Sequence, residues 1–422
     1  MAEIAPLKTM RFDTAVAGEL SSLISPPYDV IDESLRERLA GANPYNVVSI
    51  DLPQDPSGGD KYNHAADLVD IWLSDGALTT ETEPALWVLR QRYTGPDGAE
   101  RTRHGLFARV RVTDYGPGRI RPHERTHPGP KQDRLDLMRA TKANLSPIFS
   151  LFGDDSGDIA AALLAIAEGE AFGSAGDLDA NENSLWRVSD SATIEQLTVA
   201  LADRELLIAD GHHRYETARA YAAEIGGEGD HNYVLMFLCA LQDPGMTVFA
   251  THRLAKDTTR EQQEAIRDEI MKSFDVSEVS VDQLAPPDDS DTSICEFGYL
   301  DSFHGKPYRL KLKNQATADA ALADKPPAYR ELDTAILEAL FLKGALGMSD
   351  DDISHLNGLG YSSNLTEARE LVESKKFDLA FFLRPTPIEQ IRQIAAEGEN
   401  MPPKSTYFYP KIPTGLVFNP LT

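Results

Sequence analysis

The chemistry of this sequence is concentrated at five consecutive residues, Asp210, Gly211, His212, His213 and Arg214. An apolar run precedes them and a pattern with helical spacing follows, which predicts a strand that turns through the glycine into a helix. The start of a helix leaves backbone N–H groups unpaired, and such groups can hold an anion. The histidines can donate, accept or bind a metal, and the planar fork of the arginine suits phosphate or carboxylate.

A simpler interpretation of this turn is structural, with Asp210 capping the helix and the histidines making local hydrogen bonds. The functional interpretation is favoured because two adjacent histidines, an acid and an arginine surround one glycine. The turn lacks the lysine and the longer glycine loop of a Walker motif, so it is not a P-loop. It is a candidate site for an anion.

A second concentration of charge lies between residues 119 and 142. Seven Lys or Arg stand here against three Asp or Glu, a balance of +4 in a chain whose net charge is −26. A solvated basic face is the simple interpretation of such a run. The run also holds His123 and His127, two of the ten histidines, which favours a pocket for an anion. Lys131 and Arg134 are then candidates for holding phosphate.

Glu124 lies between these two histidines. A spacing of four between histidines suits a zinc-binding helix, but the flanking prolines disfavour a helix and we expect a loop. On a loop, the carboxylate of Glu124 could accept the proton of a substrate hydroxyl or bind a metal. An ion pair with a neighbouring arginine is the structural alternative.

Three further segments carry groups that could contact a substrate or a phosphate. Two prolines stiffen the loop that presents Tyr28 and Asp29. A predicted strand at 246–251 ends beside His252 and Arg253. The C-terminal segment mixes aromatic residues with prolines, unlike a disordered tail, and is expected to pack on the body. Its residues that could bind phosphate, or could decorate an extended edge, are Lys404, Ser405, Thr406 and Lys411.

The elements that must position these residues alternate along the chain. They predict an α/β (α+β) fold with mixed, partly antiparallel sheets flanked by helices. Two hairpins are predicted, one joining residues 86–93 to 103–112 and one joining 294–302 to 307–313. Further strands are predicted at 206–209, 233–241, 246–251 and 379–383. Helices are predicted at 133–143 with Asp133 as the cap, 159–168, 193–203, 215–225, 332–346, 365–374 and 387–397.

Length and composition fit ordinary globular domains. The 422 residues are 41% hydrophobic and 26% charged, enough for two or three domains. The expected segments are an N-terminal α/β domain with the basic loop at 1–155, a central domain with the turn at 156–280, and a C-terminal α/β region at 281–422 that docks back on the body. Two cysteines are too few for a disulfide framework or a four-cysteine zinc site.

Charge and hydropathy exclude several classes of partner. A net charge of −26 opposes binding of nucleic acid, whose phosphates would be repelled by the surface as a whole. No apolar segment approaches the roughly 18 residues that span a bilayer, and the first residues lack the pattern of a secretory signal. We expect a cytoplasmic protein with a small-molecule substrate and no membrane or nucleic-acid partner, and leave its oligomeric state open.

Six segments together resemble a bacterial and archaeal family, the domain of unknown function 1015. These segments are residues 25–31, 123–135, 143–149, 209–218, 251–254 and 401–411. The resemblance spans nearly the whole chain and implies the fold of that family. The name of the family implies no activity.

The turn also resembles the corresponding turn of the ParB and sulfiredoxin-like superfamily, whose members bind nucleotide phosphates there and include a free-serine kinase. This second resemblance covers residues 206–225 and implies a ParB/sulfiredoxin-like nucleotide-binding core. It also implies that Glu124 takes the base role of the kinase's glutamate, although the sequence around Glu124 departs from the kinase pattern. The residues that would contact the phosphates are Gly211, His212, His213 and Arg214.

These observations favour phosphoryl transfer from ATP or ADP to a hydroxyl of a small metabolite, with serine indicated by the resemblance. Arg214 and Lys131 would hold phosphates, Glu124 would accept the hydroxyl proton, and Asp210 or Asp29 would help to place Mg²⁺. The predicted substrate contacts are Tyr28, Asp29, His123, His252 and Arg253. The predicted phosphate contacts outside the turn are Lys131, Arg134, Lys404, Ser405, Thr406 and Lys411.

Two alternatives to a kinase stay open. In the first, Asp210, His123, His212 and His213 gather a metal that activates water against a phosphoester. In the second, the protein is a noncatalytic nucleotide-binding regulator of the ParB type. Retention of a tightly bound metal would favour the hydrolase, and binding of a nucleotide without any product would favour the regulator.

Overall fold

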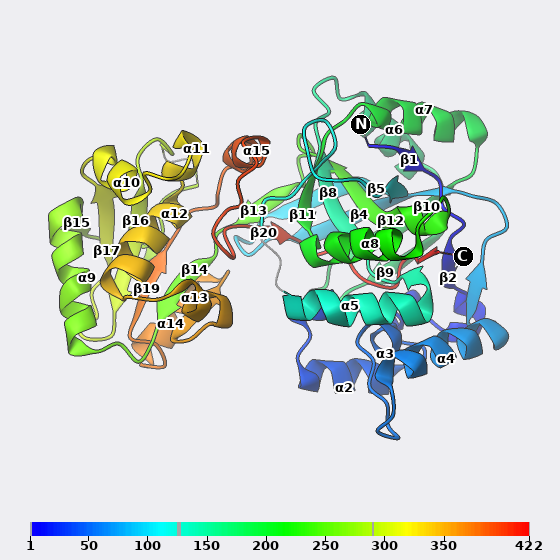
Figure 1. Ribbon diagram of the computed structural model, residues 1–422, viewed down its shortest axis with the longest axis horizontal. Helices are drawn as coiled ribbons and strands as arrows, with labels where there is room; N and C mark the ends of the chain where they lie inside the picture. Colours follow the sequence, from blue (N-terminus) through cyan, green and yellow to red (C-terminus); the bar gives the residue numbers. More distant parts are fainter. Residues whose placement is uncertain (1, 125–127, 289–290, 422) are drawn as a thin grey trace. The chain divides into compact units, whose positions relative to one another are not determined.

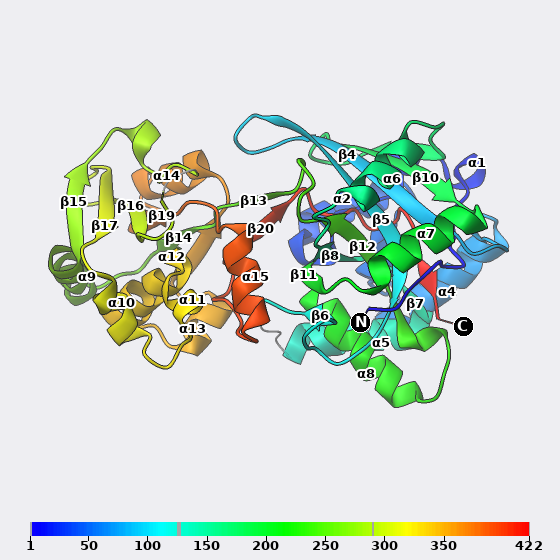
Figure 2. The same ribbon diagram turned by 90° about the horizontal axis from the view of Figure 1, so that it is seen from above.

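The computed structural model describes residues 2–124, 128–288 and 291–421, and their contacts divide the chain into two compact units. Unit 1 comprises residues 2–122, 128–246 and 410–421, and unit 2 comprises residues 123–124, 247–288 and 291–409. Figures 1 and 2 show helices and sheets in each unit, and parallel and antiparallel pairs occur together, so the predicted α/β fold class is confirmed. The division at residues 155 and 280 stays a prediction.

Unit 1 contains the N-terminal, central and extreme C-terminal elements. Its strands are β1 (Ile4–Ala5), β2 (Met10–Phe12), β3 (Leu78–Thr80), β4 (Leu86–Thr94), β5 (Glu100–Arg111), β6 (Ile120–Arg121), β7 (Ala143–Asn144), β8 (Ile148–Phe152), β9 (Gly173–Gly176), β10 (Glu182–Val188), β11 (Leu206–Asp210), β12 (Tyr233–Ala240) and β21 (Asn419–Pro420). Its α-helices are α1 (Thr14–Ala17), α2 (Glu33–Ala42), α3 (Val48–Asp51), α4 (Lys61–Ser74), α5 (Pro128–Thr141), α6 (Asp158–Ala167), α7 (Ser191–Ala202) and α8 (His212–Ile225), with short 3-10 turns η1 (Leu20–Ser22), η2 (Tyr28–Val30) and η3 (Asp230–Asn232).

Unit 2 contains the elements from residue 247 to residue 409. Its strands are β13 (Thr247–Phe249), β14 (His252–Ala255), β15 (Phe274–Glu278), β16 (Glu296–Asp301), β17 (Tyr308–Leu312), β18 (Leu359–Ser362), β19 (Leu379–Phe382) and β20 (Tyr407–Tyr409). Its helices are α9 (Arg260–Ser273), η4 (Val281–Gln283), α10 (Gln315–Ala321), α11 (Pro327–Arg330), α12 (Asp333–Leu337), the π-helical segment η5 (Glu338–Ala345), α13 (Asp350–His355), α14 (Leu365–Glu373) and α15 (Ile388–Ala396).

A mixed sheet forms the centre of unit 1. Its strand order is β6-β11-β8-β12-β5-β4-β10-β9, with β1 paired to β5. Strand β12 is parallel to β8 and β11 is parallel to β6, whereas β4, β5 and β10 pair antiparallel. The predicted hairpin is confirmed, because β4 and β5 pair from Trp87 opposite Phe107 to Thr94 opposite Glu100. The sheet therefore carries β11, and with it the turn, between β6 and β8.

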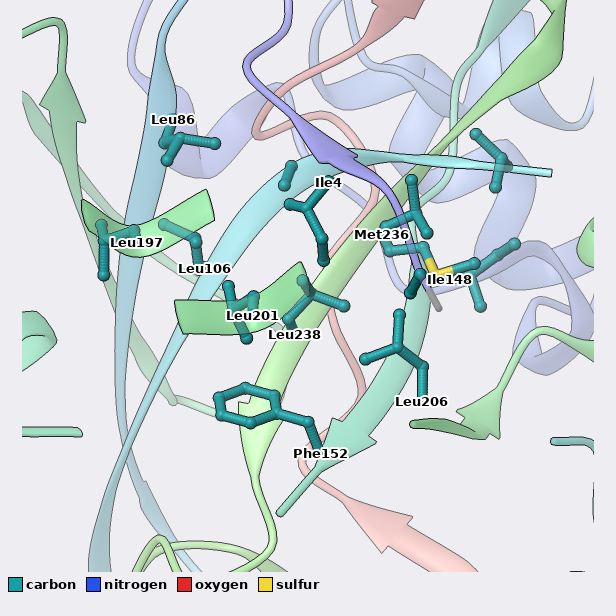
Figure 3. Packing of buried hydrophobic residues seen from close by; sticks show 14 of the residues in the cluster. Ile4, Leu86, Leu106, Ile148, Phe152, Leu197, Leu201, Leu206, Met236 and Leu238 are labelled. Carbon is teal, nitrogen blue, oxygen red and sulfur yellow. The ribbon is translucent and has the colours of Figure 1, made fainter. Parts of the chain in front are cut away.

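One face of this sheet forms a continuous apolar core. Alternate residues of the strands face it, as Figure 3 shows for Leu106 of β5 and for Met236 and Leu238 of β12. Helix α7 contributes Leu197 and Leu201 to the same cluster, and α6 and α8 contribute further buried side chains. Figures 1 and 2 also show α6 lying against β4 and β5, and α8 beside α5. Helix α8 is thus fixed to the sheet by its apolar side chains, and its first turn is fixed with it.

The opposite face of the sheet holds a fully buried arginine. Nη2 of Arg103 donates to the carbonyl oxygen of Pro410 at 2.6 Å, and the same nitrogen donates to Gln91. The guanidinium lies over the ring of Phe149, with 4.7 Å from Cζ to the ring centroid. These bonds hold the chain immediately before Lys411 against the sheet.

Unit 2 has a second, antiparallel sheet. Its order is β15-β17-β16-β19-β14-β18, and the predicted hairpin of β16 and β17 is confirmed by the pairing of Phe297 with Leu310. One face of the sheet packs on α14 through Leu254, Ala368 and Phe382. The other face carries a cluster of aromatic rings in which Phe341 of η5 contacts Phe274 and Phe381. This unit therefore has its own core.

Two local expectations were wrong. Helix α5 begins at Pro128 and not at Asp133, because proline is well suited to the first turn of a helix. Asp133 therefore is not a cap, and it accepts hydrogen bonds from Lys61 and Arg134. His252 and Arg253 were expected beside the end of a strand at 246–251, but β13 already ends at Phe249 and the two residues open the next strand, β14.

Within the described ranges, no helix has both the length and the apolar character that a membrane crossing needs.

Candidate functional site

The turn consists of the end of β11, Gly211 and the first residues of α8. The register between β11 and β8 shifts between Ile208 and Asp210, and Asp210 lies opposite Phe149. Gly211 has φ +98° and ψ 28°, a left-handed conformation that residues with a side chain disfavour. A Cβ atom on Gly211 would also lie 2.9 Å from Nε of Arg214. Both the turn and the close approach of the arginine therefore favour glycine here.

Asp210 holds two cationic side chains. Nη2 of Arg214 donates to its Oδ2 at 2.5 Å, and Nζ of Lys411 donates to its Oδ1. Burial by itself would raise the pKa of Asp210, but Lys411 and Arg214 outweigh burial and hold that pKa well below its usual range. The carboxylate is therefore ionised at neutral pH and fixes both cations beside the start of α8.

Arg214 is anchored on a second side. Its Nη1 donates to the carbonyl oxygen of Pro147, directly before β8, and the residue is 8% exposed. Within the described part of the chain, its Nε has no hydrogen-bond partner. Arg214 also lines a cavity of about 40 Å³ together with Arg134, Asn144 and Ser146. Such a cavity has room for about one water molecule, so the guanidinium borders space that a small polar group can enter.

Tyr28 lies against the guanidinium of Arg134, whose Cζ is 4.2 Å from the ring centroid. Burial raises the pKa of Tyr28 to about 12, while the nearby charge of Arg214 acts in the opposite direction. Tyr28 therefore keeps its proton at neutral pH and can donate a hydrogen bond. The charge of Arg134 is balanced by two carboxylates, since Nη1 contacts Oδ1 of Asp51 at 3.2 Å and Nη2 contacts Oδ2 of Asp133 at 2.6 Å.

The other predicted residues of unit 1 differ in exposure. His212 is 5% exposed, and its charge is among the influences that lower the pKa of Asp210. His213 and Lys131 are half-buried, and the carbonyl oxygen of Lys131 accepts a hydrogen bond from Thr217 at 3.4 Å. Asp29 is exposed.

His123 lies in unit 2 and is buried. One of its ring nitrogens lies 2.9 Å from Oγ1 of Thr406, and its carbonyl oxygen accepts a hydrogen bond from the backbone of Met401. The ring also packs edge-on against Phe408, with 5.8 Å between centroids. His123 therefore ties the short segment 123–124 to the strand β20 region. Arg125 and His127 lie outside the described residues.

Glu124 is half-buried in unit 2, and its charge acts on the pKa of Arg253 and of Tyr361. Arg253 is 2% exposed and donates to the carbonyl oxygens of Thr251 and of Pro403. Its Cζ lies 5.2 Å from the ring centroid of Tyr361. Glu124 thus lies close enough to a buried cation and a buried phenol to act on both electrostatically.

The remaining predicted residues of unit 2 have mostly structural contacts. The hydroxyl of Ser405 is buried and donates to the carbonyl oxygen of Pro402 at 2.6 Å. Lys404 is exposed and has a positive φ of 57°. Nδ1 of His252 accepts from the backbone N–H of Leu383 at 3.3 Å, and burial lowers the pKa of His252 to about 4. His252 is therefore neutral at pH 7.

The predicted residues thus fall into two sets. Unit 1 contains Tyr28, Asp29, Lys131, Arg134, Asp210, Gly211, His212, His213, Arg214 and Lys411. Unit 2 contains His123, Glu124, His252, Arg253, Lys404, Ser405 and Thr406. The structure brings Asp210, Arg214 and Lys411 into direct contact, and the role of each residue in either set stays a prediction.

Sequence reasoning missed three residues around Arg214 and Arg134. Asp51 accepts from Arg134 and also from the hydroxyl of Ser146 at 2.9 Å, and Asn144 lines the same cavity. Asn144 and Ser146 belong to the segment 143–149 that carries part of the family resemblance, and this signal could have found them. Nothing in the local sequence marks Asp51.

Among the described residues, no group of three or more His, Cys, Asp or Glu side chains is arranged to hold a metal ion. The metal centre that the hydrolase alternative requires stays a prediction, because His123 belongs to unit 2 whereas Asp210, His212 and His213 belong to unit 1. Both oxygens of Asp210 accept from cationic side chains, so a metal ion there would add to a local excess of positive charge. Asp210 does not fit the predicted Mg²⁺ site in this arrangement.

The family described as "Protein of unknown function (DUF1015)" matches residues 4–335, which confirms the resemblance found in the sequence. A solved structure of a conserved hypothetical protein from Pyrococcus furiosus has 15% identity and a TM-score of 0.35, covering 70% of this chain and 92% of that chain. Free serine kinase in complex with AMP has 15% identity and a TM-score of 0.34, with 70% and 88% covered. SbnI from Staphylococcus aureus, with a C-terminal truncation, has 10% identity and a TM-score of 0.37, with 73% and 85% covered. No curated protein sequence matches this chain.

Proposed function

We infer the activity of this chain, which belongs to the DUF1015 family, from its own site, and we propose nucleotide-dependent phosphoryl transfer to a hydroxyl of a small metabolite. The phosphates of ATP or ADP bind at the turn between β11 and α8. Serine is the first acceptor to test, because the turn resembles that of a superfamily that includes a free-serine kinase.

The observation that carries this proposal is the pair of cations that Asp210 holds beside the start of α8. The carboxylate neutralises one of the two charges, so Arg214 and Lys411 leave a positive excess. The N–H groups at the start of the helix add to the positive potential. In a chain with a net charge of −26, a local positive site is what an anionic ligand requires.

The proposed reaction breaks the bond between the terminal phosphorus of the nucleotide and its bridging oxygen. The acceptor hydroxyl forms the new bond to that phosphorus, and the shortened nucleotide leaves with the electron pair of the broken bond. Arg214 and Lys411 stabilise the negative charge on the transferring group, and Tyr28 can donate a hydrogen bond to it. Positioning and charge neutralisation supply most of the catalysis in reactions of this class.

The hydroxyl proton needs a base, and we assign this role to Glu124, following the resemblance. A carboxylate is suited to the role because one of its oxygens can accept the proton as the new bond forms. No step is assigned to magnesium, since Asp210 is engaged by the two cations. The test of Glu124 is separate from the test of the turn.

The deciding experiment incubates the protein with ATP or ADP, Mg²⁺, serine and pooled metabolites, and detects phosphorylated products by mass. Thermal shift with the same nucleotides measures binding. We expect a product and a higher melting temperature with one of the two nucleotides. A protein that gives neither would contradict the proposal, and binding without a product would indicate a regulator.

Lys411→Gln tests the turn, with Lys8→Gln as the matched control, because Lys8 is an exposed lysine of the same unit outside the turn. Loss of one charge-assisted contact to a phosphate should weaken nucleotide binding about tenfold, or about 1.4 kcal/mol. Lys8→Gln should bind as the parent does. Glu124→Gln should keep binding and lose the product, and equal turnover by this variant would remove Glu124 from the reaction.

A further inference from the structure

A groove in unit 2 lies between helix α9 and the hairpin of β16 and β17, and none of its lining residues belongs to unit 1. Helix α9 packs beside β15 at the edge of the second sheet, as both ribbon views show. The groove encloses about 460 Å³. This volume lies in the range of about 300 to 1,000 Å³ that is typical of small-molecule sites.

The groove is lined largely by apolar and aromatic side chains. Three of them are unusually exposed for their types, since Phe303 is 55% exposed, Met271 is 63% exposed and Val276 is 42% exposed. Tyr299 and Leu310 form part of its floor on the sheet. Such a surface is costly to leave in water, at roughly 25 cal/mol per Å², and a ligand with an apolar body would remove that cost.

The charged residues of the groove are two arginines, two carboxylates and one histidine, and one of the arginines is not part of an ion pair among the described residues. Arg260 pairs with Glu264 at 3.0 Å, and Nδ1 of His304 lies 3.0 Å from Asp301. Asp301 is itself held in the hairpin loop, where its Oδ1 accepts from the backbone N–H groups of Phe303 and His304. Arg267 is exposed on α9 and, within the described ranges, has no ion-pair partner. Its planar fork is therefore available to a carboxylate or a sulfonate.

We propose that this groove is a binding site for a small amphipathic anion, in which Arg267 holds the acidic group and Phe303, Met271 and Val276 contact an aliphatic or aromatic body. The site shares no residue with the phosphate-binding turn, so it binds its ligand whether or not the chain is a kinase. An uncharged ligand of the same shape loses the contact with Arg267. A cationic ligand is disfavoured by the charge of Arg267.

The test uses 8-anilinonaphthalene-1-sulfonate, an aromatic anion that fluoresces when its ring leaves water. We expect about one equivalent to bind to the full, folded chain, and octanoate to displace it while octylamine does not. The uncharged N-phenyl-1-naphthylamine serves as the comparison ligand. Binding of the anion in several equivalents without displacement by octanoate would overturn the proposal.

Arg267→Gln should weaken binding of the anion at least fivefold and leave binding of the uncharged analogue unchanged. Phe303→Ser should weaken both ligands, because the side chain is exposed and its loss does not disturb the core. Arg38→Gln, at an exposed arginine of α2 in unit 1, is the matched control and should bind as the parent does. If Arg267→Gln and Phe303→Ser both bind the anion as the parent does, the groove is not the site. Circular dichroism of each variant establishes that it is folded.

Discussion

Two identical His-Arg dipeptides behave differently in the two units. His213-Arg214 follows a glycine at the start of a helix, and Arg214 pairs with the carboxylate of Asp210. His252-Arg253 opens a strand, and Arg253 donates to two backbone carbonyl oxygens. Both arginines are nearly buried, at 8% and 2% exposure. The difference lies in the groups that bind each guanidinium, a carboxylate for Arg214 and carbonyl oxygens for Arg253, and not in the dipeptide itself.

This comparison shows that a buried cation can either remain available to a ligand or have its hydrogen-bond donors used by contacts within the fold. Asp210 fixes Arg214 and Lys411 together, and the excess charge is available to an anion. Arg253 has its Nη atoms on carbonyl oxygens and its guanidinium over Tyr361. These backbone partners stabilise the position of Arg253, but they do not form a binding site for a ligand. The three predictions that follow test this difference.

The largest effect is expected from Asp210→Asn. Removal of the charge leaves Arg214 nearly buried without its carboxylate, and breaking such a pair costs about 3 to 5 kcal/mol of unfolding free energy. Urea denaturation of the full chain, followed by circular dichroism, measures this cost, because that signal reports the helices and strands of both units. Glu338→Gln, near Arg253 but paired with Lys343, should cost about 1 kcal/mol or less. Equal losses for the two variants would remove the contrast between the arginines.

A smaller effect concerns pH and His252, whose pKa burial lowers from 6.5 to about 4. As the pH falls from 6.5 to 4, the unfolded chain binds a proton there before the folded chain does, so the unfolding free energy falls. The loss of unfolding free energy that His252 causes reaches about 3 kcal/mol at pH 4, and it is absent above pH 7. Asp333 acts in the opposite direction, because burial raises its pKa to about 6.

The measurement is therefore the difference between the parent and His252→Gln in denaturation curves from pH 4 to pH 7. The variant should lose less stability on acidification. His355→Gln is the control, since the side chain of His355 is 68% exposed, and it should follow the parent curve. A variant at His252 that follows the parent curve would show that this histidine is not the acid-sensitive group.

The smallest effect is expected from Gly211→Ala, at about 2 kcal/mol. About half comes from the left-handed backbone, and the rest comes from displacing Arg214, whose guanidinium would lie 2.9 to 3.1 Å from the new Cβ. Gly58→Ala separates the two terms, because Gly58 has φ +77° with nothing within 4 Å of its Cβ position. Gly58→Ala should cost about 1 kcal/mol in the same urea titration. If Gly211→Ala lowers the unfolding free energy only as much as Gly58→Ala does, then Arg214 is displaced without a cost in stability.

Much of the fold could be predicted because its signals are local. Alternating apolar residues and turn residues indicated both hairpins, and the helical spacing indicated α6, α7, α8, α14 and α15 with boundaries within three residues. The start of α5 was predicted five residues too late, because Asp133 is of a residue type that often caps a helix. Its partners in the structure are Arg134 and Lys61, and Lys61 is distant in sequence. A helix cap is a local sequence pattern, whereas an ion pair can join residues that are distant in sequence and meet only in the folded chain.

The sequence alone determined the turn at Asp210, because a strand, a glycine and a helix follow one another within about 20 residues and need no distant partner. Only the tertiary structure decided what neutralises each cation. Lys411 reaches Asp210 across 201 residues of sequence, and Arg134 meets Asp51 across 83. The different surroundings of the two His-Arg pairs likewise arise only on folding. Burial and hydrogen bonding depend on the elements that pack around a residue and not on its neighbours in sequence.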